Sequence, residues 1–239
     1  MSAVKKSASR GFPVKPPWRT ASFGIRGWPL VLFMGIVCWY GSVMATHANS
    51  GDRNARLFEE AFQAHEAGVK GDSDAVDVAL EKFERILESD PENMEALVFF
   101  GSASTLKARD VGIFQRMRWV RQGVEAMDRA FETAPNNISV RIVRAVNSYQ
   151  LPAFLGRRKV ADEDFRLLLE WMETRPEKFD PGMIRFTLYH AGVHALEQGQ
   201  PEAVPLLAQA LDQRRGETIT DQEIQSVLER AKIRFGESP

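Results

Sequence analysis

Apolar residues between positions 52 and 236 recur mainly at spacings of three and four, and few windows alternate with a period of two. Such spacing places apolar side chains on one face of an α-helix. We therefore expect an all-α body. The predicted helices are 55–69, 74–89, 94–108, 114–133, 138–149, 161–174, 181–198, 201–213 and 221–235.

The helix ends repeat along the chain. Segments 83–93, 127–137 and 168–181 each close a helix with a polar stop that contains Pro91, Pro135 or Pro176. Proline lacks an N–H and can begin the next helix without losing a hydrogen bond. We predict antiparallel helix pairs, with Asn137 as a helix cap. The amphipathic helix 221–235 would close the array as a capping helix.

Four residues of the first pair carry a family resemblance. Counting back from Pro91, the small residues Ala67 and Ala79 and the aromatic Phe83 fall where the tetratricopeptide repeat family has small, small and aromatic residues. Residues 55–213 thus resemble that family, which implies a short α-solenoid that binds proteins. The middle units are longer than the family's usual repeat, because of turns at 109–113 and 151–160. The turn Leu151-Pro-Ala-Phe-Leu-Gly is also similar to that of bacterial membrane-anchored or periplasmic tetratricopeptide-like proteins, and this likeness implies no activity.

The N-terminal part has a different pattern. Residues 28–45 are almost continuously apolar, and 18 residues span about 27 Å as a helix, close to the thickness of a bilayer core. We predict one transmembrane helix ahead of the repeats. Residues 1–27 hold six basic residues and no acidic one, which favours a cytoplasmic N-terminus, an inner-membrane single pass and a periplasmic or exterior body. Cleavage after Ala45 or Ala48, which would release the body into the periplasm, is the alternative.

The predicted organisation therefore has four parts. They are a disordered basic tail (1–27), a transmembrane or signal segment (28–48), a repeat domain (52–215) and a C-terminal capping helix (216–239). Without the six basic residues of the tail, 25 basic residues face 32 acidic ones, a net charge of −7. An acidic body argues against nucleic acid as a partner. The single cysteine, Cys38, excludes an intrachain disulfide.

Candidate chemistry is sparse. His190 and His194 stand four residues apart and could share a metal ion on one helix face, but the adjacent Glu of a zinc protease helix is missing. The alternative is one semi-exposed and one packed histidine. Neither a glycine-rich phosphate loop nor a nucleophile elbow occurs in the sequence. We therefore predict no enzyme activity, no cofactor and no metal.

Two basic stretches allow two interpretations each. Arg116, Arg118 and Arg121 flank Met117 on helix 114–133, as either a solvated face or an anion site. The stretch 157–159 (Arg-Arg-Lys) is either an exposed turn or a contact for anionic lipid headgroups or an acidic partner.

First helices line the concave face of a helical repeat array, so we predict a partner-binding groove there. Its candidate residues are Arg141, Arg144, Asn147, Tyr149, Phe186, Tyr189 and His190. Alternatively, Arg141 and Arg144 pair with neighbouring carboxylates. The predicted function is a non-catalytic scaffold that holds another protein, a peptide or helix in the groove, for an envelope assembly or transport complex. The alternative is a periplasmic accessory protein for a small molecule or metal.

Overall fold

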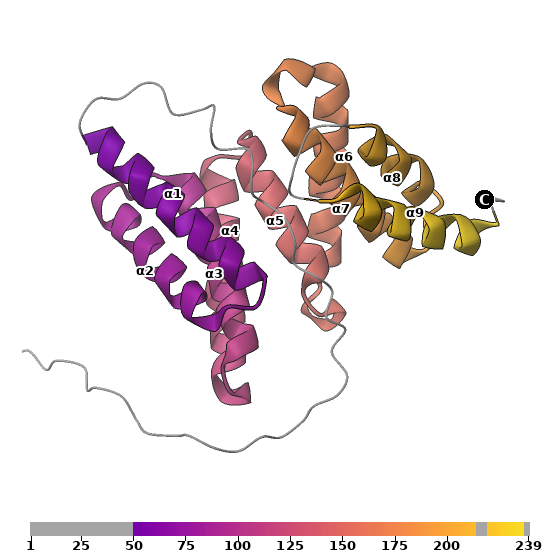
Figure 1. Cartoon of the computed structure of the whole chain (residues 1–239). Helices are drawn as coiled ribbons and strands as arrows, with labels where there is room; N and C mark the ends of the chain where they lie inside the picture. Colours follow the sequence, from indigo (N-terminus) through magenta and orange to yellow (C-terminus); the bar gives the residue numbers. More distant parts are fainter. Residues whose placement is uncertain (1–49, 214–218, 237–239) are drawn as a thin grey trace, which may run out of the picture. The chain divides into compact units, whose positions relative to one another are not determined.

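The computed structural model describes residues 50–213 and 219–236, and within them every regular element is a helix. The predicted segments 1–27 and 28–45 lie outside the described residues. The described part of the chain forms nine α-helices. Figure 1 labels them in chain order. They are α1 (Ser50–Val69), α2 (Ser73–Ser89), α3 (Met94–Asp110), α4 (Ile113–Thr133), α5 (Ile138–Gln150), α6 (Arg158–Thr174), α7 (Pro181–Gln198), α8 (Ala203–Asp212) and α9 (Asp221–Phe235).

Polar caps begin most of these helices where the sequence predicts them. The Asn137 side chain accepts a hydrogen bond from the Val140 N–H, which confirms it as a cap. Asp72, Asn93 and Asp180 cap α2, α3 and α7 in the same way. Each cap satisfies backbone N–H groups that have no partner inside the helix. Most helix bounds therefore agree with the predicted ones to within a few residues.

The two largest differences lie at helix starts. α1 begins at Ser50 rather than at residue 55. α6 begins at Arg158 rather than at residue 161, and a short 3-10 turn, Ala153–Leu155, fills part of the predicted loop. Gly156, with φ of 71°, ends that turn in the left-handed conformation. Residues 157–160 contain no Gly or Pro, so nothing in them stops a helix from starting.

The helices pack as four successive pairs, α1–α2, α3–α4, α5–α6 and α7–α8, and α9 packs on α8 and α7. Each first helix also contacts the next first helix, from α1 to α3, α5 and α7. Ser89 at the end of α2 lies 3.3 Å from Asn54 at the start of α1, whereas Lys107 at the end of α3 pairs with Asp77 early in α2. The start of α1 and the α3–α4 turn are therefore at opposite ends of these helices (Figure 1).

Close helix contact depends on glycine in the second pair. A Cβ built on Gly101 of α3 would lie 2.7 Å from the Gly123 carbonyl oxygen, and one on Gly123 of α4 would lie 2.6 Å from the Gly101 carbonyl oxygen. Real Cβ atoms do not approach so closely. The two backbones therefore touch directly, as the small residue expected at this point of the repeat allows.

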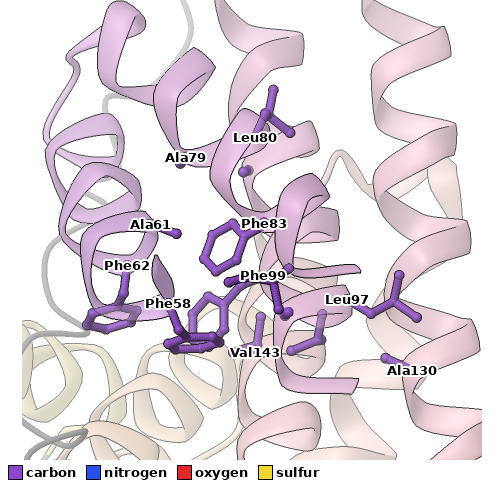
Figure 2. Close-up of a cluster of buried hydrophobic side chains, with 14 of the residues drawn as sticks. Phe58, Ala61, Phe62, Ala79, Leu80, Phe83, Leu97, Phe99, Ala130 and Val143 are labelled. Atoms are coloured by element: carbon purple, nitrogen blue, oxygen red, sulfur yellow. The ribbon is translucent and has the colours of Figure 1, made fainter. Parts of the chain in front are cut away.

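Figure 2 shows part of the first of three buried clusters, which joins α1, α2, α3 and α4 to the start of α5. Its centre is aromatic, because Phe58, Phe62 and Phe83 surround Phe99 at ring-centroid distances of 5.3 to 5.9 Å from that ring. Aromatic pairs of this geometry add to the free energy gained from burial. The second cluster contains residues from each of the helices α5 to α9, and the third contains residues from α7, α8 and α9.

Helix α5 belongs to two clusters at once. Val140 and Val143 face the first cluster, while Ala145, Val146 and Tyr149 face the second. Every residue from Ser139 to Tyr149 is consequently buried. This helix divides the interior, and its polar side chains must find partners inside the protein.

Candidate functional site

The structure places most of the predicted groove residues inside the array. Arg141, Arg144, Asn147 and Tyr149 on α5 are buried, and so are Phe186 and His190 on α7. Tyr189 alone among the seven is half-buried. Neighbouring first helices are in contact. The six buried side chains therefore lie between helices rather than lining an open groove.

A buried carboxylate explains the two arginines. Asp164 on α6 is fully buried, and Arg141 donates to its Oδ1 at 2.5 Å. Arg144 donates to both oxygens, from Nε at 2.8 Å and from Nη2 at 2.8 Å. This is the alternative in which both arginines pair with a neighbouring carboxylate. The bidentate geometry satisfies donors that burial would otherwise leave without water.

Aromatic faces complete the environment of the two cations. The Arg144 guanidinium lies 3.4 Å from the centroid of the Phe131 ring, and that of Arg141 lies 4.9 Å from the Trp171 ring. Burial lowers the pKa of Arg141 from its usual value, and Asp164 opposes this. We call Arg141, Arg144 and Asp164 the arginine clamp. The clamp joins α5 to α6, because two buried guanidinium groups share one buried carboxylate.

A second carboxylate, Asp128 of α4, extends the clamp toward the surface. Arg157 donates to both of its oxygens at 2.7 and 2.8 Å, and Arg144 lies 3.6 Å away. Arg157 therefore ties the α5–α6 turn to α4. The predicted basic stretch 157–159 is thus partly structural, whereas Lys159 is exposed.

A chain of polar contacts crosses three first helices. His65 Nε2 on α1 lies 2.9 Å from Ser102 Oγ on α3, and the Asn147 amide on α5 donates to the same oxygen at 3.1 Å. Thr105 donates to Asn147 Oδ1 at 2.8 Å. Burial lowers the pKa of His65 to about 4, which keeps the ring neutral. We call His65, Ser102 and Asn147 the polar seam.

The predicted histidine pair continues this pattern toward α7. His190 Nδ1 lies 2.7 Å from the Tyr149 hydroxyl, and burial lowers the pKa of His190 to about 3. His194 Nε2 instead lies 2.7 Å from Asp162 on α6. The hydrogen-bond partners of the two rings therefore lie on different helices, and within the described residues no group of three metal-ligating side chains gathers around them. The structure thus offers the metal hypothesis no support.

The two aromatic residues of α7 lie beside the same ring. Phe186 packs with its ring centroid 4.2 Å from that of His190, and Tyr189 lies 5.1 Å away. Burial raises the pKa of the Tyr189 hydroxyl. The partner-binding role of all seven groove residues stays a prediction. Arg141 and Arg144 bind Asp164 within the α5–α6 pair, whereas Asn147 and Tyr149 join neighbouring pairs through Ser102 and His190.

Asp164 was missed by sequence reasoning, although the sequence holds a signal for it. Ala161, Phe165 and Leu168 form the apolar stripe of α6, and Asp164 falls on that stripe at helical spacing. A carboxylate on a buried stripe requires a partner. The partners that a buried Asp164 requires are Arg141 and Arg144 on the preceding helix.

Within the described residues, none of the helices is both long and apolar enough to cross a membrane. The predicted span 28–45 lies outside them.

These features define a class. Helix pairs stack in sequence order, first helices touch first helices, and glycine or alanine lies where paired helices meet, which together describe a tetratricopeptide-like fold. Among solved structures, the chain is similar to the crystal structure of a thermophilic TPR protein from Thermus thermophilus, with a TM-score of 0.57 and 16% identity. The match covers 75% of this chain and 81% of the other. No protein-family model and no curated protein matches the chain.

Proposed function

We propose that this protein is a non-catalytic interaction scaffold whose helical repeat array binds another protein. The tetratricopeptide-like fold is the observation that carries the proposal, because such arrays present a large surface that neighbouring pairs hold rigidly. The described polar clusters support it. Their charged and polar groups bond one another in the interior, where a substrate would not reach them.

The proposal includes a place in the cell. Residues 28–45 would anchor the chain in the inner membrane, with the basic tail in the cytoplasm and the array in the periplasm, in the service of an envelope assembly or transport complex. The alternative, cleavage after Ala45 or Ala48, would leave the array in the periplasm without its anchor. Both versions expose the array to the same partners.

Tyr189 is the predicted groove residue that a partner would reach first, because it keeps part of its ring at the surface. The other six would act by fixing the positions of the first helices. The proposed binding face is therefore the surface around Tyr189 on α7. The arginine clamp would hold α5 and α6 in the arrangement that supports this face.

Photo-crosslinking in native membranes tests the proposal. A photoreactive amino acid replaces Tyr189 in the full chain, and a matched control carries it at Arg166, an exposed residue of α6. We expect one dominant protein adduct from position 189 and a weaker or different pattern from position 166. If neither position yields an adduct while the chain is intact and folded, the scaffold proposal is wrong.

A further inference from the structure

The α3–α4 turn presents large apolar side chains to solvent. Phe114 is 97% exposed, Ile113 is 71% exposed and Met117 is 42% exposed. Within the described residues, six large hydrophobic side chains are exposed. Three of them are these residues at the α3–α4 turn, and a fourth, Phe154, lies at the α5–α6 turn. A cluster of this kind marks an interaction site more often than scattered apolar residues do.

Basic residues follow the apolar ones along the same helix. Arg118 and Arg121 are exposed, and positions 114, 117, 118 and 121 share one face of α4 at helical spacing. The first acidic residue of α4 is Glu125, three turns from its start. A helix N-terminus favours acidic residues, yet the first turn of α4 holds none. Such local inconsistency is typical of a functional surface.

The order of the side chains matches the layers of a lipid surface. At about 1.5 Å per residue, Arg118 lies about 6 Å and Arg121 about 10 Å behind Phe114 along the helix axis. Interfacial segments bury their apolar side chains about 5–10 Å deep at the boundary of headgroups and acyl chains. With the ring of Phe114 at that depth, the two guanidinium groups would reach the phosphates.

We propose that these five residues, Ile113, Phe114, Met117, Arg118 and Arg121, form a tip that docks on an anionic lipid bilayer. Charge favours this occupant, because the tip exposes Arg118 and Arg121 and no acidic residue of α4 precedes Glu125. The chain beyond the basic tail carries a net charge of −7, so an anionic surface attracts this tip and repels most of the remaining surface. The exposed Phe154 and Lys159 place the same combination at the next turn, between α5 and α6. The proposal does not depend on a protein partner.

A nitroxide label reports the surroundings of the tip directly. The full chain carries Cys38→Ser, which removes its single cysteine, together with either Phe114→Cys or the control Ile233→Cys on α9, which is 78% exposed in the parent chain. Both labelled chains are reconstituted in vesicles of phosphatidylcholine with phosphatidylglycerol. Electron paramagnetic resonance then compares collisions with oxygen, which concentrates in lipid, and with a water-soluble nickel complex.

We expect the label at position 114 to enter the lipid phase and the label at 233 to remain in water. Arg118→Gln with Arg121→Gln should shift the label's lipid–water equilibrium about 30-fold toward water, since each basic residue contributes about 1 kcal/mol at an anionic surface. Phosphatidylcholine alone should have a similar effect. Because depth is measured, attachment through residues 28–45 does not mimic the result.

Equal water exposure at positions 114 and 233 in anionic vesicles would overturn the proposal. A label at 114 that stays in water there, and loses mobility only in native membranes, would assign the tip to a protein instead. Neither outcome affects the scaffold proposal, which crosslinking at position 189 tests separately.

Discussion

At the residue scale, the interior of this array depends on a few polar groups whose partners are far apart in sequence. Asp164 neutralises part of the charge of Arg141 and Arg144 from about twenty positions away. Taking a charge out of water costs several kcal/mol unless a partner and hydrogen bonds offset it. The carboxylate is therefore the member whose loss leaves the most uncompensated charge.

Asp164→Ala should lower the free energy of unfolding by about 3–5 kcal/mol, because two guanidinium groups would remain buried without their carboxylate. Denaturant titration followed by circular dichroism measures this. The control is Glu170→Ala, which removes the exposed partner of Arg166 and should cost at most about 1 kcal/mol. A cost below about 1 kcal/mol for Asp164→Ala would show that the clamp contributes little to stability.

The residue scale also shows where sequence reasoning stops. Helix caps such as Asn137 are local, so the sequence alone identifies them. Arg141 and Arg144 are charged, and the default expectation for charged residues is exposure. Their burial follows from the division of the interior by α5, which no local pattern expresses. Six of the seven predicted groove residues were therefore assigned to a surface although they are buried between helices, and only Tyr189 keeps part of its surface exposed.

At the element scale, two glycines allow the backbones of α3 and α4 to touch in the second pair. Apolar periodicity predicted both helices. It did not predict that Gly101 and Gly123 would face each other. That match depends on the crossing of α3 and α4, which packing sets.

Gly101→Ala or Gly123→Ala should destabilise the protein by about 1–3 kcal/mol, because either methyl group would push the two backbones apart. The helix propensity of alanine, about 1 kcal/mol better than that of glycine, acts in the opposite direction and is smaller than the strain. Thermal unfolding measures the sum. Gly112→Ala is the control, since a Cβ there meets nothing within 4 Å. Gly112 is the N-cap of α4, so this change should cost only the loss of a preferred capping residue, at most about 1 kcal/mol. Equal effects at all three positions would contradict the close contact.

At the scale of the whole molecule, first helices act as a continuous interior layer. α3, α5 and α7 are buried on nearly all sides, and histidines on α1 and α7 lie within that layer. His65 and His190 are neutral in the folded state, with pKa values of about 4 and about 3 against 6.5 for an ordinary histidine. The unfolded chain therefore binds more protons as the pH falls.

This sets the sign of the pH dependence. The contribution of each histidine to stability is complete above about pH 6.5 and is lost as the pH falls toward the folded pKa, by about 2 kcal/mol for each between pH 7 and pH 5. His190→Gln keeps a neutral hydrogen-bonding group, so its loss over this range should be about 2 kcal/mol smaller than in the parent chain. Denaturant titrations at both pH values measure the difference.

Glu66 works in the opposite direction, because burial raises its pKa to about 7 and protonation then favours the folded state. The difference between variant and parent isolates His190 from this effect. An unchanged slope in His190→Gln would mean that the ring already titrates normally in the folded protein.

The polar seam also limits how such a protein can change in length. His65, Ser102 and Asn147 come from three different helix pairs, so no pair carries a complete set of partners by itself. Duplicating or deleting one pair would separate Ser102 from His65 or Asn147. A buried hydroxyl or amide would then lack a hydrogen-bond partner. The pairs are consequently not interchangeable modules. Recombination between copies, which lengthens arrays of uniform repeats, would here produce less stable chains, by about 1–3 kcal/mol for each buried polar group left without a bond.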